Sequence, residues 1–198
     1  MLKPVRKLYS WTERLAYKKG AGYYLLAISF IEASLFPLPP DLLLIPIAYF
    51  NNKKGIIYAF LTTVFSVLGG LFGYLIGVFL YHNIIPPHLI IGKIISQANF
   101  NKVVELYKTN VFLVIFTAAL SPIPYKVFTI AGGYCNVNIS VFTVASFVGR
   151  GLRFFSEGIL FYAFGPAVKP YIDRNFEKLT LLAAALIVLF YLIIMKIF

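Results

Sequence analysis

Six charged side chains stand inside otherwise apolar stretches of this chain, and their types define the chemistry it could carry out. They are three carboxylates and three cations: Glu32, Asp41, Glu157, Lys126, Arg150 and Arg153. The cations could together hold a phosphate group, while the carboxylates could exchange protons or compete for the same cations. Spacings of three and four residues put Arg150, Arg153 and Glu157 on one face of a helix, where Arg153 and Glu157 can pair.

The composition of the chain indicates that these charges lie in a membrane. Of its 198 residues, 60% are hydrophobic and 13% are charged, and the mean hydropathy is +0.84. About a quarter of the residues of an ordinary soluble domain are charged, so we expect a single-domain integral membrane protein. A charge at the centre of a membrane-spanning helix costs roughly 2.5–3.5 kcal/mol, and the six charges must therefore face one shared polar interior.

Prolines interrupt two of the apolar regions that would position these charges. The interrupted regions are residues 22–50, with Pro37, Pro39 and Pro40, and residues 110–136, with Pro122 and Pro124. Prolines this close together end a helix rather than kink it, and irregular backbone at membrane depth must be buried in protein or line a water-filled cavity. We therefore expect two re-entrant hairpins whose tips face each other or water. An ordinary loop between two short spans is the alternative.

The two interrupted regions also match each other in sequence. With an offset of 85 residues, PLPPD (37–41) aligns with PIPYK (122–126), and seven of the nineteen positions from 33 to 51 are identical. The alignment pairs Asp41 with Lys126. Each region precedes a long apolar stretch, 56–80 in the first copy and 140–164 in the second. We therefore expect an all-α bundle with an inverted repeat, its copies over 22–80 and 107–165, whose hairpins enter from opposite faces.

The remaining segments indicate how the chain sits in the membrane. Residues 1–20 combine an apolar stripe with several lysines and arginines, which predicts an interfacial basic helix on an anionic leaflet. A disordered basic tail is the alternative reading. Residues 179–198 are expected to form a final transmembrane helix. The formal net charge is +11, and the positive-inside rule favours a cytoplasmic N-terminus.

Glycines recur at GxxxG spacing in the first long apolar stretch. Gly69, Gly73 and Gly77 are each four residues apart, which allows another helix to approach closely. That second helix could belong to the same bundle or to another protomer, so the pattern leaves self-association open.

At these residues the chain resembles the DedA family of membrane proteins, also called the SNARE-associated Golgi protein or VTT-domain family. The resemblance lies in FIEASLFPLPPDLLL, GGLFGYLIG, SPIPYKVFTIAGG and GRGLRFF, all within residues 22–165, and PIPYK with RGLRFF is typical of its YqaA-like branch. It implies two re-entrant hairpins, a bacterial inner-membrane location and transport of lipids, with a proton-responsive acidic pair at Glu32 and Asp41. The family's second motif has arginines where this chain has Ala119 and Tyr125, with Lys126 as the nearest cation.

The sequence therefore favours a lipid transporter, a flippase or scramblase of phospholipid or polyprenyl phosphate, with a charged site between the hairpins. Lys126, Arg150 and Arg153 would bind the lipid phosphate, and Glu32, Asp41 and Glu157 would respond to protons. Membrane lipids, and protons with them, are thus the expected partners. A small-ion or proton antiporter and a non-transporting membrane assembly factor are the alternatives.

Other classes of function have little support in the sequence. The chain has one cysteine, Cys135, and two histidines, His82 and His88, without zinc-type spacing. The histidines lie apart from the charged positions, so no nucleophile and base for a lipid phosphatase come together. We expect no enzyme activity, metal, cofactor or nucleic-acid partner.

Overall fold

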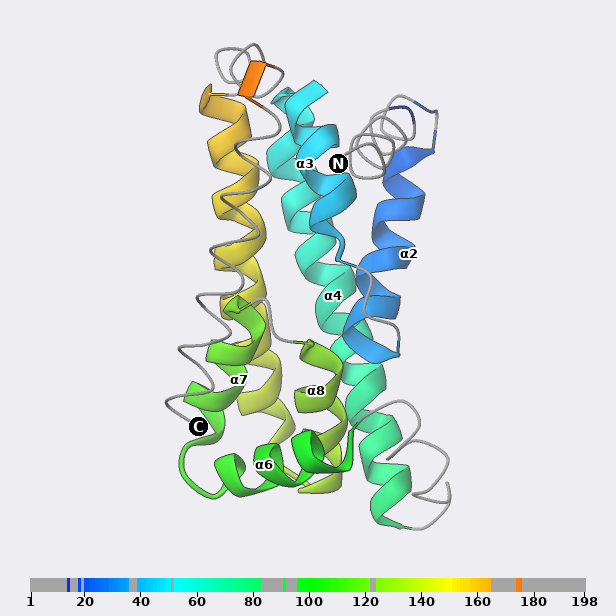
Figure 1. Ribbon diagram of the computed structural model, residues 1–198, viewed down its shortest axis with the longest axis vertical. Helices are drawn as coiled ribbons and strands as arrows, with labels where there is room; N and C mark the ends of the chain where they lie inside the picture. The colour runs from blue at the N-terminus through cyan, green and yellow to red at the C-terminus, as the bar shows by residue number, and fades with distance from the viewer. Residues whose placement is uncertain are drawn as a thin grey trace.

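The computed structural model of the chain is all-helical over the part that it describes (Figure 1). The described residues are 14, 18, 20–35, 39–50, 52–82, 91, 96–121, 124–164 and 174–175. The predicted interfacial helix over 1–20 lies outside them except at residues 14, 18 and 20. The predicted final helix over 179–198 lies outside them entirely, as do Pro37 and Pro122.

The described helices repeat one order, two short helices followed by a long one. The first set is α2 (Ala21–Ser34), α3 (Asp41–Phe50) and α4 (Asn52–Tyr81). After α6 (Gln97–Tyr107), the second set is α7 (Val111–Leu120), α8 (Tyr125–Tyr134) and a helix over residues 139–164, named the 139–164 helix below. At 1.5 Å per residue, the 30-residue α4 is about 45 Å long, whereas a 10-residue helix is about 15 Å long. Both predicted interruptions are present.

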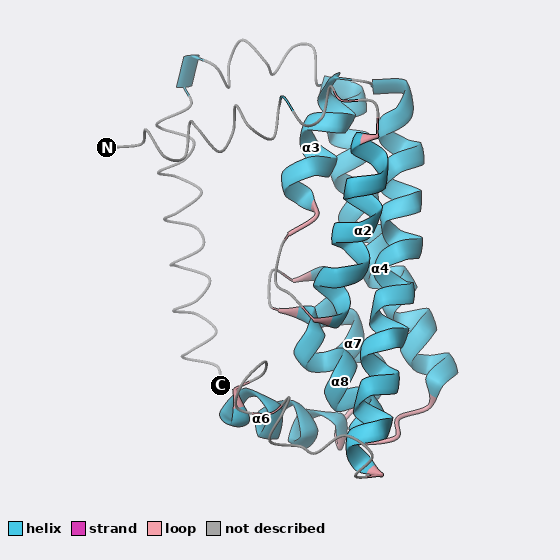
Figure 2. Cartoon of the chain, turned by 90° about the vertical axis from the view of Figure 1, so that its right-hand side faces the viewer, coloured by secondary structure: helices cyan, strands magenta, loops and turns pink. Residues whose placement is uncertain are grey.

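The two pairs of short helices lie at opposite ends of the long helices. In Figures 1 and 2, α2 and α3 lie beside one half of α4, α7 and α8 lie toward the other end, and α6 crosses that end. Gly69 of α4 faces the backbone of Phe30, and Gly77 faces the backbone of Ile130. Between them, Gly73 faces both the Ala33 carbonyl and Thr129. The end of α2 and the start of α8 therefore meet partway along α4.

The GxxxG glycines of α4 are used for packing inside the chain. A Cβ atom at Gly69 would collide with the backbone of α2, and one at Gly77 would collide with the backbone of α8. Gly133 of α8 in turn faces the backbone of Tyr74, with no room for a methyl group. Of the two arrangements open from sequence, the helix that these glycines admit belongs to the same bundle.

Two apolar cores fill the two ends of the bundle. One gathers side chains of α2, α3, the start of α4 and Phe154, including Leu25, Leu44 and Ala59. The other gathers α6, α7, α8, the second half of α4 and the start of the 139–164 helix, including Tyr74 and Phe142.

Polar side chains are buried between these cores, and we call this set, with the three less buried charges that contact it, the polar layer. Its members are Ser29, Glu32, Ser34, Asp41, Thr62, Thr63, Ser66, Lys126, Thr129, Ser146, Arg150, Arg153 and Glu157. The order along α4 shows this arrangement. Ala59 belongs to one core, Thr62 and Ser66 belong to the polar layer, and Tyr74 belongs to the other core. The layer thus lies where the short helices end.

One helix among the described residues, Gly55–Tyr81, is long and apolar enough to cross a membrane, a composition that a buried helix of a soluble protein can share. The 139–164 helix is comparably long but contains three charged residues, and it does not reach that apolar composition. The helical fold class is therefore confirmed for the described residues, while its placement in a membrane belongs to the proposal below.

The close contact between α4 and α8 predicts that Gly133→Ala is destabilising. The added methyl group meets the Tyr74 backbone, and overpacking of this kind costs about 1–3 kcal/mol, or a fall in Tm of roughly 2–12 °C. Gly151→Ala is the matched control, because its methyl would lie 3.8 Å from the Thr63 side chain, an ordinary contact. Thermal unfolding of the purified chain followed by circular dichroism measures both. Equal Tm values would contradict the packing described.

Candidate functional site

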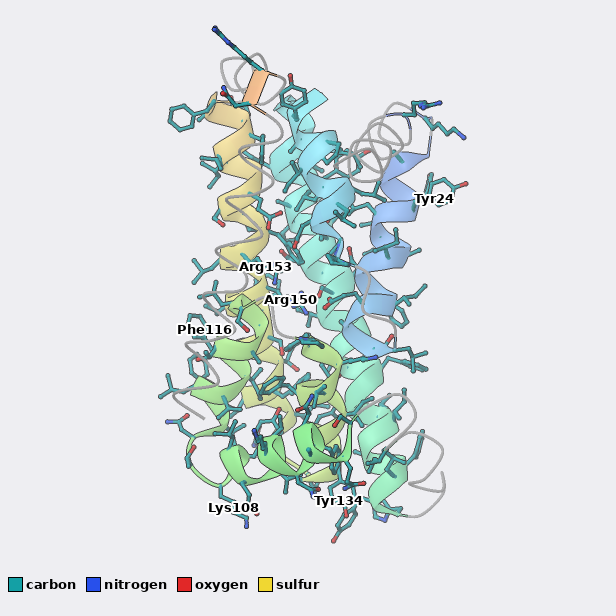
Figure 3. The ribbon with its side chains drawn as sticks, viewed as in Figure 1. Tyr24, Lys108, Phe116, Tyr134, Arg150 and Arg153 are labelled. Atoms are coloured by element: carbon teal, nitrogen blue, oxygen red, sulfur yellow. The ribbon has the colours of Figure 1, made fainter. Side chains whose placement is uncertain are left out.

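The six charged side chains singled out in the sequence all lie in the polar layer. Glu32 is in the last turn of α2, Asp41 begins α3, and Lys126 is in the first turn of α8. Figure 3 shows Arg150 and Arg153 leaving the 139–164 helix near its middle, toward α3 and α4. Helices from both ends of the bundle therefore contribute charge to one site.

Arg150 is the most enclosed of these charges. Its Nη2 atom lies 2.9 Å from Oε2 of Glu32, and the two side chains are 2% and 11% exposed. The guanidinium stacks over the ring of Tyr125 at 4.2 Å and lies 5.8 Å from the ring of Phe154. A cation over an aromatic face is stabilised by the ring quadrupole, and more so when water is excluded. Glu32 and the two rings thus hold Arg150 in one position.

Arg153 connects the two hairpins. It forms an ion pair with Asp41 at the start of α3, and its Nη1 atom donates a hydrogen bond of 2.8 Å to the carbonyl of Ser121 after α7. Its Nε atom lies 3.9 Å from Oε1 of Glu157, so the predicted pair one turn apart is present. The Arg153 guanidinium therefore contacts two carboxylates and the carbonyl group that follows α7.

Asp41 and Glu157 also meet each other. Their carboxyl groups are within hydrogen-bonding reach, and one oxygen of each, Asp41 Oδ1 and Glu157 Oε2, has no donor among the described residues. Two carboxylates this close repel unless they share a proton. The arrangement can therefore hold one proton beside Arg153.

Lys126 binds the end of α2, and no described carboxylate forms an ion pair with it. Its Nζ atom donates a hydrogen bond of 3.1 Å to the carbonyl of Leu35, and Thr129 donates one of 3.0 Å to the carbonyl of Ala33. The repeat alignment set Lys126 opposite Asp41, but Asp41 pairs with Arg153. A cation at a helix C-terminus is favourable because the free carbonyls carry partial negative charge.

The described prolines of the two breaks, Pro39, Pro40 and Pro124, mark where the outgoing helices begin. The Pro40 carbonyl accepts hydrogen bonds from the backbone of Leu43 and Leu44, and the Pro124 carbonyl accepts one from Val127. Pro40 is buried, whereas Pro39 and Pro124 are exposed. Proline suits the first position of a helix because its missing N–H group would have no partner there. These residues therefore shape the hairpin tips and carry no chemistry of their own.

Two contributors to the site were not predicted from the sequence. Tyr125 supports Arg150 and hydrogen-bonds Ser146, and the carbonyl of Ser121 accepts from Arg153. Tyrosine is too common in this chain to attract attention by type, since it occurs 14 times. Its place directly before Lys126, at the proline break, was the available signal.

Comparison with known proteins shows two bacterial relatives. An uncharacterized protein of Haemophilus influenzae is 36% identical over 151 residues, which cover 74% of this chain and 75% of that protein. An uncharacterized protein of Histophilus somni is 31% identical over 147 residues, again 74% of this chain and 75% of the relative. The chain belongs to their family.

Neither relative carries a named function. No family model matches the chain, and no solved structure matches it. The resemblance to the DedA family therefore stays a prediction. No group of metal-binding side chains occurs among the described residues.

The buried pair predicts strong coupling between Glu32 and Arg150. Arg150→Met leaves an uncompensated carboxylate in the interior, which costs about 3–5 kcal/mol of unfolding free energy. Adding Glu32→Gln to this variant should recover part of the loss, because the stranded charge is gone. Chemical denaturation of the two single variants and the double variant measures the coupling free energy.

The control for this cycle is the exposed pair Glu105–Lys108 on the surface of α6, whose side chains are 68% and 67% exposed. Its coupling should stay below about 1 kcal/mol. Additive effects of the Glu32 and Arg150 substitutions would contradict the buried ion pair.

Proposed function

We propose that this protein is an integral membrane lipid transporter, a flippase or scramblase, whose polar layer binds the phosphate of a lipid in transit. The observation that carries the proposal is the gathering of six charged side chains where two hairpins from opposite ends of the bundle meet. A polar site at that depth, reached from both ends by short helices, suits a substrate group that must cross an apolar barrier.

The outer surface supports the placement in a membrane. Large apolar side chains are exposed along both long helices, among them Phe60, Leu68, Phe72, Leu75 and Phe79 of α4 and Val144, Phe147, Leu152, Ile159 and Leu160 of the 139–164 helix. An apolar surface this extensive marks a contact with protein or lipid. Lipid accounts for it along the full length of both helices, and Gly55–Tyr81 has the length and composition of a span.

Under this proposal the hairpins α2–α3 and α7–α8 are re-entrant and enter from opposite leaflets. Backbone that leaves a helix at membrane depth must be satisfied within the protein, and the bonds from Lys126, Thr129 and Arg153 to free carbonyls meet that requirement. The DedA resemblance agrees with this arrangement. We place the protein in the bacterial inner membrane with its N-terminus in the cytoplasm, as the basic residues of the N-terminal segment favour.

The charge balance of the polar layer suggests how protons take part. Three carboxylates face three cations, so the layer is neutral when all six are ionised. A lipid phosphate adds negative charge and competes with Asp41 and Glu157 for Arg153. Protonation of a carboxyl group, such as one of the facing pair of Asp41 and Glu157, frees a cation for the phosphate. Deprotonation then returns the carboxylate and releases the lipid.

A proton antiporter is the second candidate, and the facing carboxyl groups of Asp41 and Glu157 favour it. Such a protein would use the same proton site for a small ion instead of a lipid. A non-transporting assembly factor would keep the polar layer for its structure alone.

The proposal predicts that Arg153→Gln reduces lipid translocation by at least about tenfold, because a charged hydrogen bond of this kind contributes roughly 1.5–3 kcal/mol. Glu32→Gln should also lose transport. The assay reconstitutes the purified chain in liposomes and follows a labelled phospholipid and a labelled polyprenyl phosphate, with and without a pH gradient. Lys108→Gln is the control, since Lys108 is exposed next to α6 and pairs only with Glu105 among the contacts described.

Each outcome of this assay favours one of the three candidate functions over the others. Full activity of Arg153→Gln would remove the polar layer as the transport site. Proton flux without lipid movement would favour the antiporter. Absence of both lipid and proton flux would favour the assembly factor, provided that cells carrying Arg153→Gln or Glu32→Gln grow like cells carrying the parent chain.

A further inference from the structure

Two hydroxyl groups of α4 lie in the polar layer and have no hydrogen-bond partner among the described residues. Thr62 and Ser66 are both 0% exposed, and neither side-chain oxygen has a partner among the described residues. They are four residues apart, so they lie on the same face of the helix. The large majority of buried hydroxyl groups are bonded, and an exception needs an explanation such as a bound ion, an ordered water molecule or a functional role.

The neighbouring hydroxyl groups behave differently. Thr63 donates to the carbonyl of Ala59 at 2.8 Å, Ser29 to that of Leu25 at 2.7 Å, and Ser146 to that of Phe142 at 2.6 Å. This bond to the preceding turn is the usual solution for serine and threonine in an apolar helix. Thr62 and Ser66 also each have a carbonyl group one turn earlier in α4, but neither hydroxyl group donates to it.

Contacts between the helices place this face of α4 at the level of the charges. Gly55 packs on Ala48 of α3, and because α3 and α4 are antiparallel, Thr62 is level with Asp41 at the start of α3. Gly70, one turn after Ser66, lies against the ring of Tyr125, which in turn supports Arg150. The two hydroxyl groups therefore span the levels of Asp41 and Arg150.

Arg150 itself keeps one donor unused. Its Nη2 atom is bonded to Glu32, while Nε is buried and has no partner in the part of the chain that the structure describes. A guanidinium can only donate, so whatever completes this side must supply acceptor atoms and tolerate a positive charge. Together with two free hydroxyl donors, that requirement selects an oxyanion over a cation.

We propose that Thr62, Ser66 and the Nε–H group of Arg150 form a subsite for the oxygens of a phosphate group. The subsite rests on the proposed function, since a lipid phosphate is the phosphate that function supplies, and it extends that function by adding α4 as a wall of the site. Arg150 binds the phosphate through Nε while Nη2 stays with Glu32. The two hydroxyl groups bind further oxygens and orient the headgroup without adding charge to the neutral layer.

The test measures phosphate binding to the purified full-length chain in a maltoside detergent, which contains no phosphate. The probes are short-chain phosphatidic acid and inorganic phosphate, and the readout is the Kd from ligand-dependent shifts in Tm. Thr62→Val and Ser66→Ala should each weaken binding about tenfold, the loss expected for one hydrogen bond to a charged group. Thr143→Val, which removes a hydroxyl group outside the polar layer that donates to the Ile139 carbonyl at 2.7 Å, should bind like the parent chain.

Thr62→Ser provides a second check, because it keeps the hydroxyl group and should retain the parent affinity even if Thr62→Val lowers the Tm of the unbound chain. Binding of phosphatidic acid alone would assign the subsite to a lipid headgroup, and binding of both probes would assign it to the phosphate group itself. Equal affinities of Thr62→Val, Ser66→Ala and Thr143→Val would overturn the subsite, as would a parent chain that binds neither probe.

The liposome assay separates this inference from the proposed function. Lipid translocation by the parent chain, with unchanged binding in the hydroxyl variants, would remove the subsite and leave transport standing. Hydroxyl-dependent phosphate binding without lipid movement would remove transport and leave the subsite.

Discussion

The free carbonyl groups at the ends of α2 and α7 are the constraint on which the rest of this structure depends. Both helices stop partway along the bundle, and the last carbonyls of a helix have no partner within it. Lys126 and Thr129 of α8 donate to the end of α2, and Arg153 donates to the carbonyl that follows α7. Each interruption is thus completed by residues that lie far away in the chain, so neither hairpin can form its tip alone.

This requirement explains why the charges are buried together. Lys126 and Arg153 bring positive charge to the helix ends, and Asp41 balances Arg153 within the same layer. Replacing a buried ion pair by apolar side chains is often neutral or stabilising, so stability alone is a weak reason to retain Glu32 and Arg150. Their pairing fixes the position of the 139–164 helix against α2, and it keeps a guanidinium ready where the two hairpins meet.

Much of this arrangement could be predicted from the sequence, for physical reasons. Proline has few places in a helix interior, so PLPPD and PIPYK located both breaks, and charge in an apolar stretch is costly enough to locate the shared interior. The pairing within the layer could not be predicted in the same way. Asp41 and Lys126 align in the repeat but bind different partners, because the helix that carries Arg153 reaches Asp41 only after the bundle has packed. Thr62 and Ser66 carried no signal as residues, since serine and threonine in a helix usually bond to their own backbone.

A neutral layer constrains how any anion can enter it. All three cations already have partners, so a phosphate gains little unless a carboxylate gives up its cation or a donor is unused. The facing carboxyl groups of Asp41 and Glu157 offer the first route, because one proton removes the competition for Arg153. The donors on Thr62, Ser66 and Arg150, which lack a partner among the described residues, would offer the second under our proposal, because binding oxygen atoms there would leave the Glu32–Arg150 pair intact. Under the proposed transport function, a phosphate held through the second route would lie in a site whose charge is set by the first route, which would separate binding from release.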